Sequence, residues 1–93
     1  MRLKSWEVEA IRDEIRSLDG AAEVYLFGSR VDDKARGGDI DLLVVSQRIG
    51  EGDRTRLQHR LHRRLGDQRI DLVIVPDLQR PFAQVVLPGA RPL

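Results

Sequence analysis

The sequence predicts a small α/β (α+β) fold in which a mixed β-sheet packs against helices. Two segments repeat apolar residues at helical spacing, and three short apolar runs bounded by turn residues have the pattern of strands. These elements follow one another as helix, strand, turn, strand, helix and strand. Alternation of this kind favours a sheet covered by helices in two or three layers.

Composition places the chain among ordinary globular proteins. Its 93 residues fit one domain, and its 41% hydrophobic and 33% charged contents argue against a disordered chain. There is no cysteine, which excludes disulfides, thiolate-held zinc and a cysteine nucleophile. The sequence shows no signal-peptide core and no membrane-spanning run, so the expected location is the cytoplasm. The net charge of +1 gives no general argument for nucleic acid as a partner.

The first helix is expected to be capped by Ser5 and to end at Asp19-Gly20. Glu7 and Glu9 lie in its first turn, where a carboxylate interacts favourably with the helix dipole. Four apolar residues fall on one face of this helix: Val8, Ile11, Ile15 and Leu18.

Two strands are expected next, at residues 22–27 and 39–45. The polar residues 29–36 between them are compatible with one or two helical turns, and Gly37-Gly38 forces a turn before the second strand. That strand is nearly continuous in apolar residues after its acidic start, which is typical of a strand covered on both faces.

The second helix is expected at residues 53–65, with an apolar stripe formed by Leu57, Leu61 and Leu65. Residues 69–76 then form a third strand, which is closed by a proline that cannot donate to a ladder. The tail, residues 77–93, holds three of the four prolines, so only a short helix near residues 82–87 is expected.

Paired carboxylates at the start of the second strand are the main functional signal. Asp39 and Asp41 point to the same face of a strand, about 6–7 Å apart, and repel each other unless a positive charge lies between them. Mg²⁺ suits such a pair, because it binds one or two carboxylates and takes phosphate oxygens as further ligands. Asp71 starts the third strand in the same way, so it joins the pair if the two strands are neighbours. Three carboxylates suit two metal ions in phosphoryl transfer. Solvated strand-entry positions are the alternative interpretation.

Gly28 and Ser29 follow the first strand and precede the expected helical turn. A glycine lets the backbone approach a ligand closely, and the N–H groups at a helix start point toward an anion. The pair is therefore a candidate phosphate site if the metal site lies nearby, although an isolated Gly-Ser after a strand is weak evidence and favours a plain turn. Arg30 and Arg36 flank this segment and are candidates for contacts with phosphate oxygens.

These motifs together resemble the DNA polymerase β-type nucleotidyltransferase superfamily, and the compact unit "FGSR…GDIDLLVV" resembles its minimal nucleotidyltransferase (MNT) branch. The resemblance implies a nucleotidyltransferase-like fold over residues 1–93, with a core at about 5–76 and a Pro-rich tail at 77–93. It implies that Gly28 and Ser29 bind the terminal phosphates of ATP, with Arg30 as a further candidate. It also implies that Asp39, Asp41 and Asp71 are catalytic and bind two Mg²⁺ ions.

The same resemblance suggests a partner. Minimal members are commonly antitoxins encoded with HEPN-domain toxins, and they can transfer AMP from ATP to a tyrosine hydroxyl of the HEPN ribonuclease. The expected assembly is therefore a hetero-oligomer of the two proteins, whose acceptor lies on the second chain. An antitoxin that neutralises its toxin by binding alone remains the alternative. The sequence does not name the nucleotide, the acceptor residue or the stoichiometry.

An arginine stripe on the second helix gives a third, weaker hypothesis. Arg56, Arg60 and Arg63 recur at helical spacing, which suits either a solvated face or a surface for an acidic partner or RNA. Aromatic content is only 4%, which argues against direct nucleic-acid binding because stacking platforms are scarce. His59 and His62 are expected to be surface residues, since no third metal ligand is near them.

Overall fold

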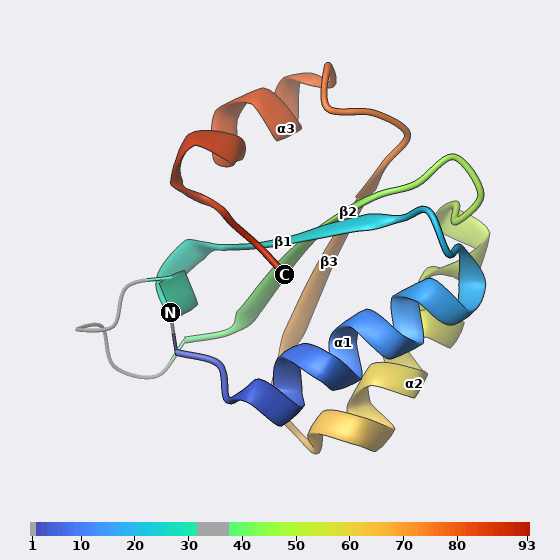
Figure 1. Ribbon diagram of the computed structural model, residues 1–93, viewed down its shortest axis with the longest axis vertical. Coiled ribbons are helices and arrows are strands. Elements are labelled where there is room, and N and C mark those ends of the chain that lie inside the picture. Colours follow the sequence, from blue (N-terminus) through green and yellow to red (C-terminus); the bar gives the residue numbers. More distant parts are fainter. Residues whose placement is uncertain (1, 32–37) are drawn as a thin grey trace.

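The computed structural model describes residues 2–31 and 38–93. Within them, a mixed sheet has the strand order β3-β2-β1-β4. Its strands are β1 (Glu23–Phe27), β2 (Ile40–Val45), β3 (Ile70–Val75) and β4 (Arg91–Pro92). Helices α1 (Ser5–Leu18) and α2 (Arg54–Leu65) lie side by side on one face of the sheet, and α3 (Pro81–Val86) lies on the other (Figure 1). The predicted α/β fold class and element order are confirmed.

The strand pairings determine which residues meet at each end of the sheet. β1 and β2 are antiparallel, with Phe27 opposite Asp41, whereas β2 and β3 are parallel, with Asp41 opposite Asp71. A parallel pair needs a long crossover, which α2 and its flanking turns provide. The crossover returns the chain to the same end of the sheet, so the starts of β2 and β3 are neighbours.

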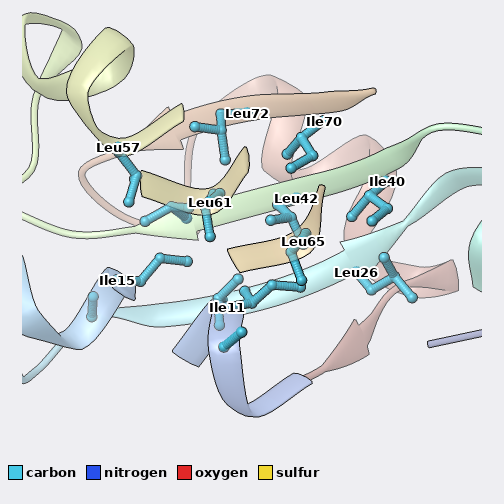
Figure 2. Packing of buried hydrophobic residues seen from close by; sticks show 14 of the residues in the cluster. Ile11, Ile15, Leu26, Ile40, Leu42, Leu57, Leu61, Leu65, Ile70 and Leu72 are labelled. Carbon is cyan, nitrogen blue, oxygen red and sulfur yellow. The ribbon is translucent and has the colours of Figure 1, made fainter. Parts of the chain in front are cut away.

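The main core lies between the sheet and the helix pair α1 and α2. Figure 2 shows leucines of α2 reaching toward isoleucines of α1 and toward the inner faces of β1, β2 and β3. The predicted stripe on α2 is confirmed, since Leu57 and Leu61 are fully buried. The stripe on α1 is confirmed at Ile11 and Ile15, which are fully buried, whereas Val8 is only half-buried. Burial of each such side chain contributes about 1.5–3 kcal/mol, so this layer supplies most of the hydrophobic stabilisation.

A smaller apolar cluster covers the other face of the sheet. Leu43 and Val45 of β2 and Val75 of β3 pack here against Ala83 of α3. Phe27 meets Phe82 edge-to-face, with ring centroids 5.7 Å apart. β2 is therefore covered on both faces over Leu42–Val45, as its continuous apolar sequence predicts, whereas Asp41 lies beyond this cluster.

Two local expectations differ from the structure. Ser5 is the first residue of α1 rather than its cap; the capping position is Lys4, whose backbone N–H donates to Glu7 Oε1 at 2.9 Å. The carboxylate of Glu7 reaches back one turn to accept this N–H, which is the role of the acidic residue in a capping box. α2 begins at Arg54 because the preceding residues Glu51–Asp53 form a 3₁₀ turn.

The tail also contains a strand that the sequence did not predict. β4 pairs with Tyr25 and Leu26 of β1, and the Leu93 N–H donates to the Val24 carbonyl. Its two residues and its proline give no strand signal by themselves, so only the edge of β1 makes this a strand. Among the described residues, no helix is long and apolar enough to cross a membrane.

Candidate active site

Three aspartates meet at one end of the sheet. Asp39 directly precedes β2 and Asp41 lies in β2. Asp71 lies in β3, directly opposite Asp41. Their side chains lie on the face that carries α3, because Ile40 and Leu42, which alternate with them, are buried on the side of α1 and α2. The structure therefore brings the three predicted acidic residues together. Each is only partly buried, so an ion or a substrate can reach them from solvent.

The surroundings of Asp41 disfavour its negative charge. Partial burial raises the pKa of the Asp41 carboxyl, and the nearby carboxylates of Asp71 and Asp39 raise this pKa further. Arg69 acts in the opposite direction, because a positive charge favours the ionised form. A site of this kind is stabilised by additional positive charge.

Arg69 lies between two of the three acids. Its Nε is 3.5 Å from Asp39 Oδ2 and 3.7 Å from Asp71 Oδ1. Both ion pairs are long, and 75% of the Arg69 side chain is exposed, so the guanidinium is held loosely. By contrast, the backbone of Arg69 is fixed, since its carbonyl accepts a 2.9 Å hydrogen bond from the Ile40 N–H.

Gly28 forms the wall of the site next to Asp41. Its φ of +78° is a left-handed conformation, which a residue with a side chain rarely adopts. A Cβ at this position would lie 2.2 Å from Asp41 Oδ2, so the carboxylate occupies the space of the missing side chain. Gly28 begins a 3₁₀ turn, Gly28–Val31, that also includes Ser29 and Arg30. The Gly-Ser segment is thus adjacent to the acids, as its proposed phosphate-binding role requires.

Arg30 already has acceptors for all of its guanidinium nitrogens. They donate to the carbonyls of Gly38 and Arg2 and to Gln68 Oε1, at 2.8–3.2 Å. Gln68 in turn donates to the buried carboxylate of Glu7 at 2.9 Å. This network joins the turn after β1 to α1 and to the entry of β3. Phosphate binding by Arg30 stays a prediction, because these three bonds use only three of the five N–H groups of its guanidinium. Arg36, the other flanking arginine, lies outside the described residues.

The acids fit a divalent cation in kind. Carboxylate oxygens are the ligands that Mg²⁺ takes, and Asp39, Asp41 and Asp71 share one face and one end of the sheet. In the described part of the chain, no three His, Cys, Asp or Glu side chains are already drawn together as a metal-binding group. Arg69 contacts Asp39 and Asp71 in the place where a cation would serve both. The donor set therefore suits Mg²⁺, while a closed coordination shell requires these side chains to rearrange.

An apolar hollow of about 450 Å³ adjoins Gly28. Phe27 and Val31 line it from the side of β1 and the turn, and Val86 and Gly89 line it from the tail. Because Phe27 is opposite Asp41 in the sheet, the hollow lies beside the acids. Flat or apolar groups of a bound molecule can be buried here while its charged groups face the carboxylates.

The arginine stripe lies away from the acids, on the layer of α1 and α2. Arg56, Arg60 and Arg63, with Arg64, border a hollow of about 420 Å³ that also contains Glu14. Two of these arginines, Arg60 and Arg64, make 3.0 Å ion pairs with Glu14, which lower the pKa of its carboxyl against the opposing effect of burial. Arg56 pairs with Asp53 at 2.8 Å. The stripe is thus partly neutralised within the chain.

Sequence reasoning missed two residues of the site, Arg69 and Gln68. Arg69 precedes Asp71 by two positions, so strand alternation alone places both on one face. That signal was available in "RID". Gln68 carried no such signal, because its role depends on Glu7 and Arg30, which are distant in sequence.

A partly exposed group of carboxylates beside a glycine turn is compatible with a phosphate that is bound together with a cation. The family model of the nucleotidyltransferase domain matches residues 8–91, which span the whole sheet except for the last residue of β4. The chain belongs to this nucleotidyltransferase domain family. No curated protein matches the chain significantly.

Membership of this family agrees with the expected superfamily and fold, and it assigns nucleotidyl transfer to the chain as a general chemistry. It does not distinguish the minimal branch from others. The roles of Gly28, Ser29, Arg30 and the three aspartates therefore stay predictions, to which the structure adds their positions.

Proposed function

We propose that the chain is a Mg²⁺-dependent nucleotidyltransferase that moves AMP from ATP to a hydroxyl of a partner protein. The proposed acceptor is a tyrosine of a HEPN ribonuclease toxin, whose neutralisation makes the chain an antitoxin. One observation carries the catalytic part: Asp41 and Asp71 are direct neighbours beside Gly28 in a chain of the nucleotidyltransferase family.

In this reaction the acceptor hydroxyl oxygen attacks the α-phosphorus of ATP. The bond from that phosphorus to the bridging oxygen of the β-phosphate breaks, and pyrophosphate leaves. Asp71 accepts the hydroxyl proton, and the backbone N–H groups of the turn at Gly28 and Ser29 hold the terminal phosphates. Bound Mg²⁺ at Asp39, Asp41 and Asp71 would neutralise charge on the transferring phosphate.

An acceptor on a second protein suits the surface around the acids. Phe82 is 43% exposed and Val85 is 78% exposed on α3, which covers the same face of the sheet. α3 carries no charged residue, so this side of the acids offers an apolar surface to a partner.

The test uses the chain, its HEPN-type partner, Mg²⁺ and ATP labelled at the α-phosphate. We expect label on the partner with the wild type, and loss of nearly all of it with Asp41→Asn, which keeps the shape of the side chain and removes its charge. Asp77→Asn is the matched control, because Asp77 follows β3 at the opposite end of the sheet. Replacing the acceptor tyrosine by phenylalanine is expected to abolish labelling.

Two results would contradict the proposal in different ways. An unlabelled partner across the Mg²⁺ range would remove the catalytic claim. Toxin neutralisation that survives Asp39→Ala and Asp41→Ala would favour an antitoxin that acts by binding alone. The RNA hypothesis would instead require RNA affinity that falls steeply with salt and is lost when Arg56, Arg60 and Arg63 are replaced together.

A further inference from the structure

Arg69 is a charged residue beside the acids to which the proposed reaction gives no role. Its backbone is held to the site through the bond to Ile40. Its side chain pairs with two carboxylates that a metal ion would use, Asp39 and Asp71. Both contacts exceed 3.4 Å, and most of the side chain faces solvent. Long ion pairs of this kind in water are weak and exchange readily.

The contrast with Arg30 separates the two arginines near the Gly-Ser turn. Arg30 donates to three neutral acceptors from three parts of the chain, so it is built into the fold. Among the described residues, the side-chain contacts of Arg69 are two ion pairs, with Asp39 and with Asp71. Within the described residues, moving Arg30 breaks three hydrogen bonds that hold the turn, whereas moving Arg69 breaks two long ion pairs.

Charge balance gives Arg69 a use in both states of the site. Three carboxylates lie at the same end of the sheet, and among the described residues Arg69 is the cation that pairs with two of them. Once divalent cations neutralise the acids, a guanidinium between them is repelled. A bound nucleotide then brings several negative phosphate oxygens to the same place, and a guanidinium binds phosphate well.

We propose that Arg69 is the internal counter-ion of the acid cluster: it bridges Asp39 and Asp71 while the site lacks a divalent cation, leaves when one binds, and then binds a phosphate oxygen of the nucleotide. The inference rests on the proposed function, since it assumes a cation and a nucleotide at these acids. It makes Arg69 a competitor of the metal ion and a partner of the nucleotide.

The experiment measures binding of Mn²⁺ alone, from the loss of the free-ion resonance signal, to the full chain without nucleotide. We expect Arg69→Gln to tighten Mn²⁺ binding roughly two- to tenfold, because the ion no longer displaces a guanidinium. Arg63→Gln is the matched control, since it removes the same charge from the exposed face of α2, away from the acids. Arg69→Lys is expected to fall between the wild type and Arg69→Gln.

The second measurement is the affinity of a non-hydrolysable ATP analogue at saturating Mn²⁺. Here the expected direction reverses: Arg69→Gln weakens binding roughly three- to tenfold, and Arg63→Gln leaves it unchanged. Opposite signs for the two ligands distinguish the proposal from a general effect of net charge, which would act equally in both variants.

The outcomes separate this inference from the proposed function. If the wild type and Asp41→Asn both fail to bind Mn²⁺, the metal-dependent function itself is overturned, and this inference with it. If the wild type binds Mn²⁺ and Arg69→Gln binds it equally well, the function stands and the counter-ion role is overturned. Tighter Mn²⁺ binding with unchanged analogue affinity would overturn the phosphate role alone.

Discussion

At position 28, a neighbouring carboxylate occupies the space in which any other residue would place its side chain. The left-handed backbone of Gly28 and the 2.2 Å separation between a built Cβ and Asp41 Oδ2 are independent reasons for glycine. The sequence suggested close approach of a ligand as the reason. The structure adds a second reason, the approach of a catalytic candidate within the chain itself.

Gly28→Ala is therefore expected to destabilise the fold by about 1–2 kcal/mol from backbone conformation alone, and by more because Asp41 must move. Nucleotidyl transfer is expected to fall with it. Urea unfolding and the labelling assay measure the two effects. Gly20→Ala is the control, since its Cβ would meet no atom within 4 Å. If Gly28→Ala were as stable as Gly20→Ala, the steric argument would be wrong. Adding Asp41→Ala to Gly28→Ala is expected to restore part of the lost stability, because the clashing carboxylate is removed.

Only some of the residues at the candidate site could be predicted from the sequence. Asp39, Asp41 and Asp71 were predictable because strand alternation and a repeated "D-apolar" start are local patterns. The hydrogen bonds of Arg30 and the position of Arg69 between two acids were not predictable, because both depend on contacts between residues distant in sequence.

Among the elements, α2 both contributes to the core and protects the outer edge of β3. Arg54 and Gln58 donate side-chain hydrogen bonds to the carbonyls of Leu72 and Ile70, respectively. These carbonyls point away from β2, where an exposed edge would otherwise offer pairing groups to another chain. A polar residue on an amphipathic helix is easily interpreted as solvated, so this function was not predictable from the helix pattern.

Replacing Arg54 and Gln58 together by alanine is expected to lower stability by about 1–2 kcal/mol and to promote self-association through β3. Sedimentation velocity over a range of protein concentrations measures the second effect. Arg56→Ala provides the comparison, because Arg56 pairs with Asp53 at the surface of the same helix. A monomeric double variant at every concentration would refute the edge-protection argument.

A second junction between elements lies at the opposite end of the sheet from the acids. Ser46, directly after β2, donates to Asp19 Oδ2 at 2.6 Å and accepts from the Arg48 and Ile49 N–H groups. Asp19 also accepts from the Ala21 N–H at 3.0 Å. These bonds tie the α1–β1 turn to the segment that leads into α2. The hydrogen bond from Ser46 and then the bond from Ala21 lower the pKa of the Asp19 carboxyl below its ordinary value of 3.8.

Since the folded-state pKa of Asp19 is lowered, its contribution to stability is complete above pH 3.8 and is lost as pH falls further through the folded value. We expect the stability difference between wild type and Asp19→Asn to be constant from pH 7 to 5 and to shrink below about pH 4. Urea unfolding at each pH measures it. A difference that stays constant down to pH 2 would contradict the assignment. Asp77→Asn corrects for the loss of a surface carboxylate.

In the whole molecule, the sheet separates the main hydrophobic core from the face that carries the candidate active site. α1 and α2 bury the larger cluster on one side, whereas the acids, the apolar hollow and α3 occupy the other. The helix and strand positions behind this layout followed from apolar spacing, because that signal is local. β4 did not, since two residues form a strand only where β1 offers an edge.

This separation predicts where mutation unfolds the protein. Leu61→Ala, at a fully buried position of α2, is expected to cost about 2–5 kcal/mol of unfolding free energy. Val85→Ala, at a 78% exposed position of α3, is expected to change it by about 0.5 kcal/mol or less. Thermal or urea unfolding gives both values. Similar losses at the two positions would show that α3 is as much a part of the core as α2.

The parallel pairing of β2 with β3 has a consequence for the order of events during synthesis. Asp41 and Asp71 are direct neighbours only after the chain through α2 has crossed over and β3 has docked. While only β1, β2 and α2 have emerged from the ribosome, Asp71 is not yet beside Asp41. The acid cluster therefore forms only after β3 has docked, and its formation can serve as a marker that β2 and β3 have paired.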